Sequence, residues 1–197
     1  MSVPDYRLVP LSTLLNKSGE IVTRDVLSTF IPLTDSSPSQ FLEDNAITME
    51  KRDLSRTFLA ISGEGIILGF FSLGLKCIRI PDDSLLSTKI SRQCNMEPST
   101  KVAQAYLLGQ LARSVDSPKG FGDILIQDAI KLLRSAKSVV GCRMLRLDCT
   151  DELISYYSRH GFVQIRRNDE QDLKASSPNP VDKVKQRKLD RTHNVSG

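Results

Sequence analysis

The fold is decided by residues 103–134, which read AQAYLLGQLARSVDSPKGFGDILIQDAIKLLR. Residues 105–112 are mostly apolar, and this run is shorter than an ordinary helix, which favours a buried strand. After Gly122 the apolar side chains recur at intervals of three and four residues, as they do on one face of a helix. These side chains are Ile126, Ala129, Ile130, Leu133 and Ala136. The stretch therefore predicts a strand, a glycine turn and a helix over residues 123–137.

The glycine turn, residues 116–122, leads directly into the predicted helix. The first N–H groups of a helix have no partner within it and lie at the positive end of the helix dipole, an arrangement that binds phosphate. An ordinary strand-to-helix turn can carry glycines at the same spacing. Gly120 and Gly122 alone therefore leave both interpretations open.

Three segments in chain order resemble the GCN5-related N-acetyltransferases (GNAT family): LGQLA at 108–112, KGFG at 119–122 and YYSRHGF at 156–162. The resemblance covers residues 6–166. The family's pyrophosphate loop runs Gln/Arg-x-x-Gly-x-Gly/Ala, and Ser117 stands where the family usually has Gln or Arg. Residues 41–42, 55–60 and 69–73 are similar to the branch that includes the acetyltransferase toxins of toxin–antitoxin pairs, which acetylate the amine of aminoacyl-tRNA.

The resemblance implies a mixed α/β (α+β) fold, in which helices flank a mostly antiparallel central sheet with a splayed central strand. An N-acetyltransferase domain is expected over residues 1–170. Sequence patterns predict an edge strand at 5–11, one or two helical turns within 18–30, and an antiparallel hairpin at 57–61 and 66–80. A further strand is expected at 142–149, a short helix at 150–159 and a last strand at 162–165.

A capping box at residues 37–40 predicts the start of a helix that runs to about residue 51. The charged residues of this helix are interpreted as a solvated face. They are Glu43, Asp44, Glu50 and Lys51.

The resemblance also assigns cofactor-binding roles around the glycine turn. Backbone atoms of Leu111, Ala112 and Arg113 are expected to pair with the pantetheine arm and the thioester of acetyl-CoA. The pyrophosphate is expected to lie on the N–H groups of residues 119–123, with the charge of Lys119 assisting. The loop residues assigned to the cofactor are Ser117, Lys119, Gly120, Phe121, Gly122 and Asp123.

Tyr157 is the candidate general acid, because it matches the tyrosine of the family's Tyr-x-x-x-Gly-Phe ending. A phenol with an ordinary pKa of about 10 can donate a proton to a leaving thiolate. Adjacent helical residues point about 100° apart, so Tyr156 and Tyr157 are not expected to face the same way. The competing interpretation is that one of the two tyrosines packs in the core. No residue stands out as a general base.

The formal net charge of +4 belongs to the C-terminal end of the chain. Residues 174–197 hold six Lys/Arg and two Asp/Glu, so residues 1–173 are neutral. Residues 171–197 are polar and basic and have the composition of a disordered tail. A neutral body has no charge excess to build the basic stripe that tRNA binding normally shows. Clustered arginines form a candidate local patch: Arg143, Arg146, Arg159, Arg166 and Arg167.

The four cysteines lack C-x-x-C spacing and the chain has two histidines, so neither a zinc site nor a Cys–His nucleophile pair is predicted. The longest apolar run, residues 66–75, is too short to span a bilayer. No signal peptide is recognisable in the sequence. The expectation is a cytoplasmic protein without a metal or a membrane partner.

The sequence therefore predicts an acetyl-CoA-dependent N-acetyltransferase that moves an acetyl group to a primary amine. The acceptor is open between aminoacyl-tRNA, as in the toxin branch, and a small-molecule or protein amine. The alternative from a different class is a degenerate fold that binds a partner without turnover. The expected partners are the acceptor, an antitoxin protein and a second copy of the chain in a homodimer.

Overall fold

The computed structural model describes residues 4–34, 37–79 and 96–163. The expected tail at 171–197 and the end of the expected strand at 162–165 lie outside these residues. The elements follow the order β1 (Tyr6–Pro10), α1 (Leu11–Ser28), α2 (Ser37–Gln40), η1 (Phe41–Ala46), α3 (Ile47–Lys51), β2 (Ser55–Ser62), β3 (Ile67–Arg79), β4 (Val102–Arg113), α5 (Phe121–Val140), β5 (Met144–Leu147), η2 (Asp151–Leu153) and α6 (Ile154–Arg159). Here η1 is a π-helix and η2 a 3₁₀-helix.

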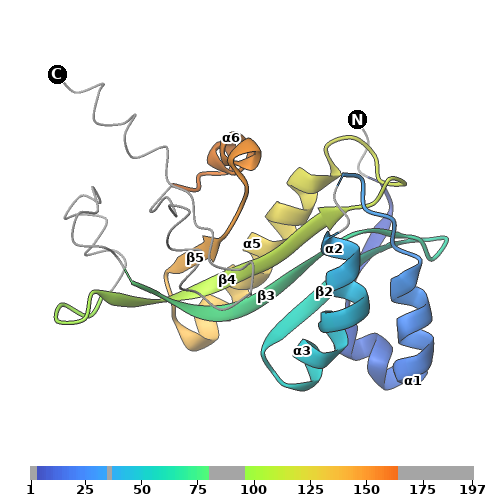
Figure 1. The fold of residues 1–197 in the computed structure, drawn as a ribbon, viewed down its shortest axis with the longest axis horizontal. Coiled ribbons are helices and arrows are strands. Elements are labelled where there is room, and N and C mark those ends of the chain that lie inside the picture. Colours follow the sequence, from blue (N-terminus) through green and yellow to red (C-terminus); the bar gives the residue numbers. More distant parts are fainter. Residues whose placement is uncertain (1–3, 35–36, 80–95, 164–197) are drawn as a thin grey trace. The chain divides into compact units, whose positions relative to one another are not determined.

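The strands form a five-stranded sheet with the order β1-β2-β3-β4-β5 (Figure 1). Strand β1 pairs antiparallel with β2, and β2 pairs antiparallel with β3 through the predicted hairpin. A register shift follows Ala60 in the second pair. This architecture is the mixed α/β class, with a mostly antiparallel sheet, that the resemblance implied.

The chain divides into two compact units, and strands β3 and β4 contribute to both. The first unit contains the described residues of 4–75 and 108–140, and the second those of 76–107 and 141–163. Each unit has its own small core and is described by itself.

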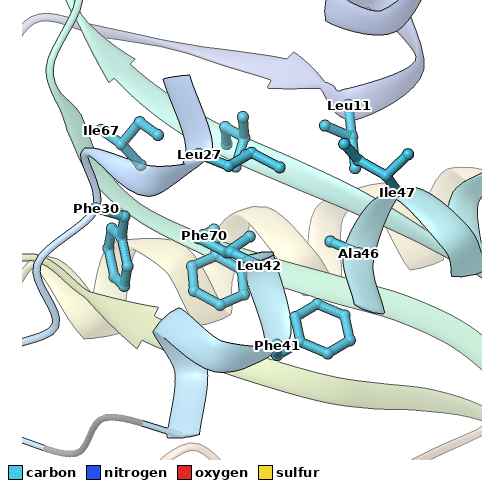
Figure 2. Packing of buried hydrophobic residues seen from close by; sticks show 10 residues of the cluster. Leu11, Leu27, Phe30, Phe41, Leu42, Ala46, Ile47, Ile67 and Phe70 are labelled. Atoms are coloured by element: carbon cyan, nitrogen blue, oxygen red, sulfur yellow. The ribbon is translucent and has the colours of Figure 1, made fainter. Parts of the chain in front are cut away.

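In the first unit, helices α1 to α3 cover one face of the sheet and α5 lies against the opposite face (Figures 1 and 2). Phe70 is the centre of the core under α1 and η1, where its ring meets Phe30 edge-on at 5.2 Å and stacks on Phe41 at 6.1 Å. Burial of an aromatic side chain of this size contributes roughly 1.5–3 kcal/mol. The cluster also includes Leu11, Leu27, Leu42, Ala46, Ile47, Leu59 and Ile67 (Figure 2).

Helix α1 is longer than the one or two turns expected within residues 18–30. It contains a kink at Gly19, whose φ of 74° and ψ of 172° are not helical. Glycine adopts a positive φ without the steric cost that other residues incur. Thr23 Oγ1 donates to the Gly19 carbonyl at 2.7 Å, so that the second half of the helix begins with a side-chain contact to the kink.

Glu50 is buried, so the interpretation of the charged residues of helix 37–51 as a solvated face is wrong for this residue. Its side chain is buried, with 5% of the residue exposed. The carboxylate accepts a hydrogen bond from the Thr57 backbone N–H at 2.9 Å and one from Arg56 Nη1 at 3.3 Å. These bonds join α3 to β2, because a buried carboxylate requires donors to offset the loss of water.

The second unit contains a smaller core, in which Ile78, Ala103 and Ala105 pack with Met96 and Met144. The Tyr106 hydroxyl donates to the Gly141 carbonyl at 2.8 Å and fastens the segment between α5 and β5 to strand β4. Phe162 and Val163 are not in a strand. Among the described residues, no helix is long and apolar enough to cross a membrane.

Candidate functional site

Strand β4 ends between two different neighbours. The Ser114 N–H donates to the Leu68 carbonyl of β3 at 2.9 Å, whereas the Arg113 carbonyl accepts from the Leu33 N–H at 3.1 Å. Pro32 bridges Ser114 in the antiparallel sense. Because successive strand residues direct their backbone groups to opposite sides, residues 31–33 lie along the side of β4 away from β3.

Because of this alternation, the three residues expected to bind the cofactor through their backbone do not all point to the same side of β4. Ala112 shares the direction of Ser114 and points its backbone groups at β3. Leu111 shares the direction of Arg113 and points its N–H and carbonyl to the side away from β3. The Arg113 carbonyl already accepts a hydrogen bond from the Leu33 N–H. Leu111 is therefore the residue of the three whose backbone groups fit the expected contact most directly.

Gly69 on β3 holds the end of β4 and the start of α5 close together. A Cβ atom at Gly69 would lie 2.7 Å from Leu125 Cδ1 and 2.8 Å from the Ala112 carbonyl oxygen. Leu125 is fully buried and comes from the first turns of α5. Strand, strand and helix thus meet at a point where only glycine fits, and this contact fixes the position of the intervening loop.

The loop between β4 and α5 is braced by its own serines. Ser114, 1% exposed, donates through Oγ to Asp116 Oδ2 at 3.2 Å and accepts from the Asp116 N–H at 3.1 Å. Ser117, 8% exposed, donates through Oγ to the Ser114 carbonyl at 2.6 Å. The Ser117 hydroxyl is therefore committed to the loop itself.

The N–H groups of the loop fall into two sets. The Phe121 N–H donates to the Pro118 carbonyl at 3.1 Å, and the Asp123 N–H donates to the Gly120 carbonyl at 3.0 Å. In the described part of the chain, no acceptor is assigned to the N–H groups of Lys119, Gly120 and Gly122. The predicted row of donors from 119 to 123 is therefore reduced to these three positions.

Gly120 and Phe121 differ in their surroundings, since Gly120 faces open space and Phe121 is buried. Gly120 has a φ of 86°, and a Cβ atom there would meet no atom within 4 Å, so the space in front of it is open. Phe121 is fully buried and packs edge-on against the Tyr6 ring, with 5.2 Å between centroids. Phe121 therefore anchors the helix start, while Lys119 and Gly120 are exposed.

Tyr6 fastens strand β1 to helix α5, and the sequence patterns gave no sign of this contact. Its hydroxyl donates to Asp128 Oδ2 at 2.5 Å. Burial, with a further contribution from the Asp128 carboxylate, raises the pKa of Tyr6 above its ordinary value. Residues about 120 positions apart are joined here, so a local signal could not have revealed the pair.

Tyr157 belongs to the second unit, where it is the buried member of the tyrosine pair. Its ring contacts Tyr156 at 5.2 Å and Phe162 at 5.7 Å, both edge-on. Burial, and to a lesser extent Cys149, raises the pKa of Tyr157 to about 12. The phenol is therefore neutral at physiological pH and carries the proton that a general acid needs.

The candidate arginine patch is weaker than the sequence indicated. Arg146 forms an ion pair with Asp148 at 3.2 Å, in which both side chains are largely buried. Arg143 and Arg159 are exposed, and Arg159 lies over the Tyr156 ring at 5.7 Å. Arg166 and Arg167 lie outside the described residues. Among the residues described, no cluster of His, Cys, Asp and Glu is arranged to hold a metal ion.

By sequence, the chain matches no known family model and no curated protein. Its structure is similar to AtaT in complex with acetyl-methionyl-tRNAfMet, with a TM-score of 0.66 and 18% identity over 87% of this chain and 98% of AtaT. It is also similar to a tyrosine-to-phenylalanine variant of KacT, with a TM-score of 0.65 and 17% identity over 84% of this chain and 90% of KacT. AtaTR bound with acetyl-CoA gives a TM-score of 0.61 and 17% identity, covering 84% and 89%. The chain has the fold of these toxins.

Proposed function

We propose that this protein is an acetyl-CoA-dependent N-acetyltransferase that acetylates a primary amine. The observation that carries the proposal is the likeness of the fold to the AtaT and KacT toxins across more than four fifths of the chain, including a structure with acetyl-CoA bound. The resemblance of the loop sequence to the GNAT pyrophosphate loop supports the same activity independently of the fold.

The residues between β4 and α5 fit the phosphate-bearing end of acetyl-CoA. Three N–H groups, those of Lys119, Gly120 and Gly122, are the candidate donors at the positive end of the α5 dipole. The open space in front of Gly120 is the space that a phosphate would take. The backbone groups of Leu111 lie on the side of β4 where a pantetheine arm can pair with them.

When bound, acetyl-CoA supplies a thioester whose carbonyl carbon is attacked by the neutral amine, so that a C–N bond forms and the C–S bond breaks. A backbone N–H directed at the carbonyl oxygen stabilises the negative charge that develops there, which is usually the largest catalytic effect. No residue is assigned as a base, and the proton of the attacking amine is lost to solvent.

Tyr157 is proposed to give its proton to the departing sulfur. A thiol has an ordinary pKa of about 8.5, so a tyrosine with a pKa of about 12 is the weaker acid. Complete transfer is therefore uphill until the phenolate regains a proton from the amine or from water. We expect Tyr157 to act first as a hydrogen-bond donor to the sulfur, and its removal to affect the transition state more than cofactor binding.

The proposed acceptor is the amine of aminoacyl-tRNA, because one structural neighbour holds acetyl-methionyl-tRNAfMet. Small-molecule and protein amines are the alternatives. A neighbouring structure of AtaT with the C-terminus of the antitoxin AtaR supports an antitoxin as a partner of this chain. A homodimer and a cytoplasmic location complete the proposal.

The test is release of free thiol from acetyl-CoA in the presence of charged tRNA, polyamines or lysine peptides. Turnover with one of these acceptors is expected, and charged tRNA is the acceptor we predict. If acetyl-CoA binds but no acceptor is acetylated, the result would favour the alternative, a degenerate fold that binds a partner without catalysis.

A further inference from the structure

The loop between β4 and α5 offers backbone donors to phosphate but little positive side-chain charge. Residues 114–123 contain one cation, Lys119, and two acidic residues, Asp116 and Asp123, which gives a net charge of −1. The position where the family usually has Gln or Arg is Ser117, and its hydroxyl donates to the Ser114 carbonyl. A side-chain cation beside the loop would add to the backbone donors in binding a ligand with several phosphates.

Arg113, the last residue of β4, is placed to supply that cation. Its Nη1 atom lies 3.5 Å from Ser117 Oγ, which sets the guanidinium beside the loop residue that replaces the usual Gln or Arg. The distance is at the limit of a hydrogen bond, so this contact holds the side chain only weakly. The backbone of Arg113 is fixed on both sides, because its carbonyl accepts from the Leu33 N–H and the Ser114 N–H donates to the Leu68 carbonyl.

Arg113 also differs from the other arginines of the described chain. Two of them, Arg113 and Arg146, are half-buried, and the rest are exposed. Arg146 is paired with the carboxylate of Asp148 at 3.2 Å. Arg113 has no carboxylate partner among the described residues. A half-buried guanidinium without a carboxylate partner is available to a bound anion.

We infer that the Arg113 side chain binds a phosphate group of the acyl-CoA cosubstrate and replaces the cation that the loop sequence lacks. A guanidinium suits this role because its planar fork donates two parallel hydrogen bonds to phosphate oxygens. The inference rests on the proposed function and adds a side-chain role to a residue expected to act through its backbone. It leaves open whether the contact is to the pyrophosphate or to the 3′-phosphate of the nucleotide.

The experiment measures the affinity of the full-length protein for three ligands by calorimetry: acetyl-CoA, acetyl-dephospho-CoA and S-acetyl-pantetheine. Arg113→Gln should weaken acetyl-CoA binding by roughly tenfold or more, as expected for loss of a charge-assisted hydrogen bond. Affinity for S-acetyl-pantetheine, which has neither the pyrophosphate nor the 3′-phosphate, should not change. A loss that persists with acetyl-dephospho-CoA assigns the contact to the pyrophosphate, and a loss that disappears assigns it to the 3′-phosphate.

Two further variants make the result specific. Arg113→Lys keeps the charge but loses the fork, so its affinity for acetyl-CoA should lie between those of the parent and Arg113→Gln. Arg134→Gln removes an exposed arginine of α5 and should have no effect. Equal acetyl-CoA affinity of Arg113→Gln and the parent protein would overturn the inference and leave the proposed function standing. Equal losses for acetyl-CoA and S-acetyl-pantetheine would also overturn it, because they would indicate a structural effect. If the parent protein binds no acetyl-CoA, the proposed function fails and the inference fails with it.

Discussion

Replacement of Gly69 by alanine should destabilise the protein at the contact that positions the loop. The added Cβ would lie 2.7 Å from Leu125 Cδ1 and 2.8 Å from the Ala112 carbonyl oxygen. The leucine methyl can turn away, but the oxygen belongs to the backbone of β4 and can retreat only if the strand moves. Overpacking of this kind costs about 1–3 kcal/mol. In a chain of 197 residues, each kcal/mol lowers the melting temperature by roughly 2–4 °C.

The assay is thermal unfolding followed by circular dichroism, with Gly63→Ala as the matched control. Gly63 lies in the turn of the β2–β3 hairpin, and a Cβ atom there would meet nothing within 4 Å. We expect Gly69→Ala to melt roughly 2–12 °C below the parent and Gly63→Ala to melt within a degree or two of it. A Gly69→Ala variant that melts at the same temperature as the parent would show that β3, β4 and α5 do not meet closely at Gly69.

Three other predictions follow from the tyrosines. Tyr6→Phe removes the hydrogen bond to Asp128 and should lower the free energy of unfolding by about 1–2 kcal/mol, as measured by denaturant titration. Unchanged stability would show that this bond does not hold β1 to α5. Because the pKa of Tyr157 is raised from 10 to about 12, the stability it contributes is full below pH 10 and is lost as the pH rises towards 12. The loss is roughly 3 kcal/mol, and Tyr157→Phe should reduce this part of the alkaline dependence, whereas an identical pH profile would contradict it. Tyr157→Phe should also lower turnover by about a hundredfold with little change in cofactor affinity. The control, Tyr156→Phe, should lower turnover only slightly. The reverse order of the two variants would assign the general acid to Tyr156.

Local patterns were sufficient to predict the elements around the loop. The apolar run before Arg113 and the spacing of Ile126, Ala129 and Leu133 predicted β4 and α5, and these three side chains are buried. Such patterns work because one buried strand and one amphipathic helix each leave a period in the sequence. The hairpin of β2 and β3 was found in the same way.

The details of the site depend on contacts between distant residues, and the sequence could not show them. The burial of Glu50, the pairing of Tyr6 with Asp128 and the segment beside β4 at residues 31–33 all join positions on different elements. Ser117 was assigned to the cofactor as a replacement for Gln or Arg, yet its hydroxyl is directed into the loop. The three-dimensional arrangement brings the Arg113 guanidinium within 3.5 Å of the Ser117 hydroxyl.

If acetyl-CoA binds at the loop between β4 and α5, two glycine variants should respond differently to it in a thermal-shift titration. Gly120 and Gly65 have nearly equal positive φ values, 86° and 89°, and open surroundings, but Gly65 lies in the β2–β3 turn. Valine at either position should therefore cause similar backbone strain. At a ligand concentration of about a hundred times Kd, acetyl-CoA should stabilise the parent and Gly65→Val by about 2.7 kcal/mol.

We expect Gly120→Val to gain no stability from acetyl-CoA, because the valine side chain fills the space of the phosphate. An equal rise in melting temperature for Gly120→Val and Gly65→Val would contradict it, as would the absence of any rise in the parent protein.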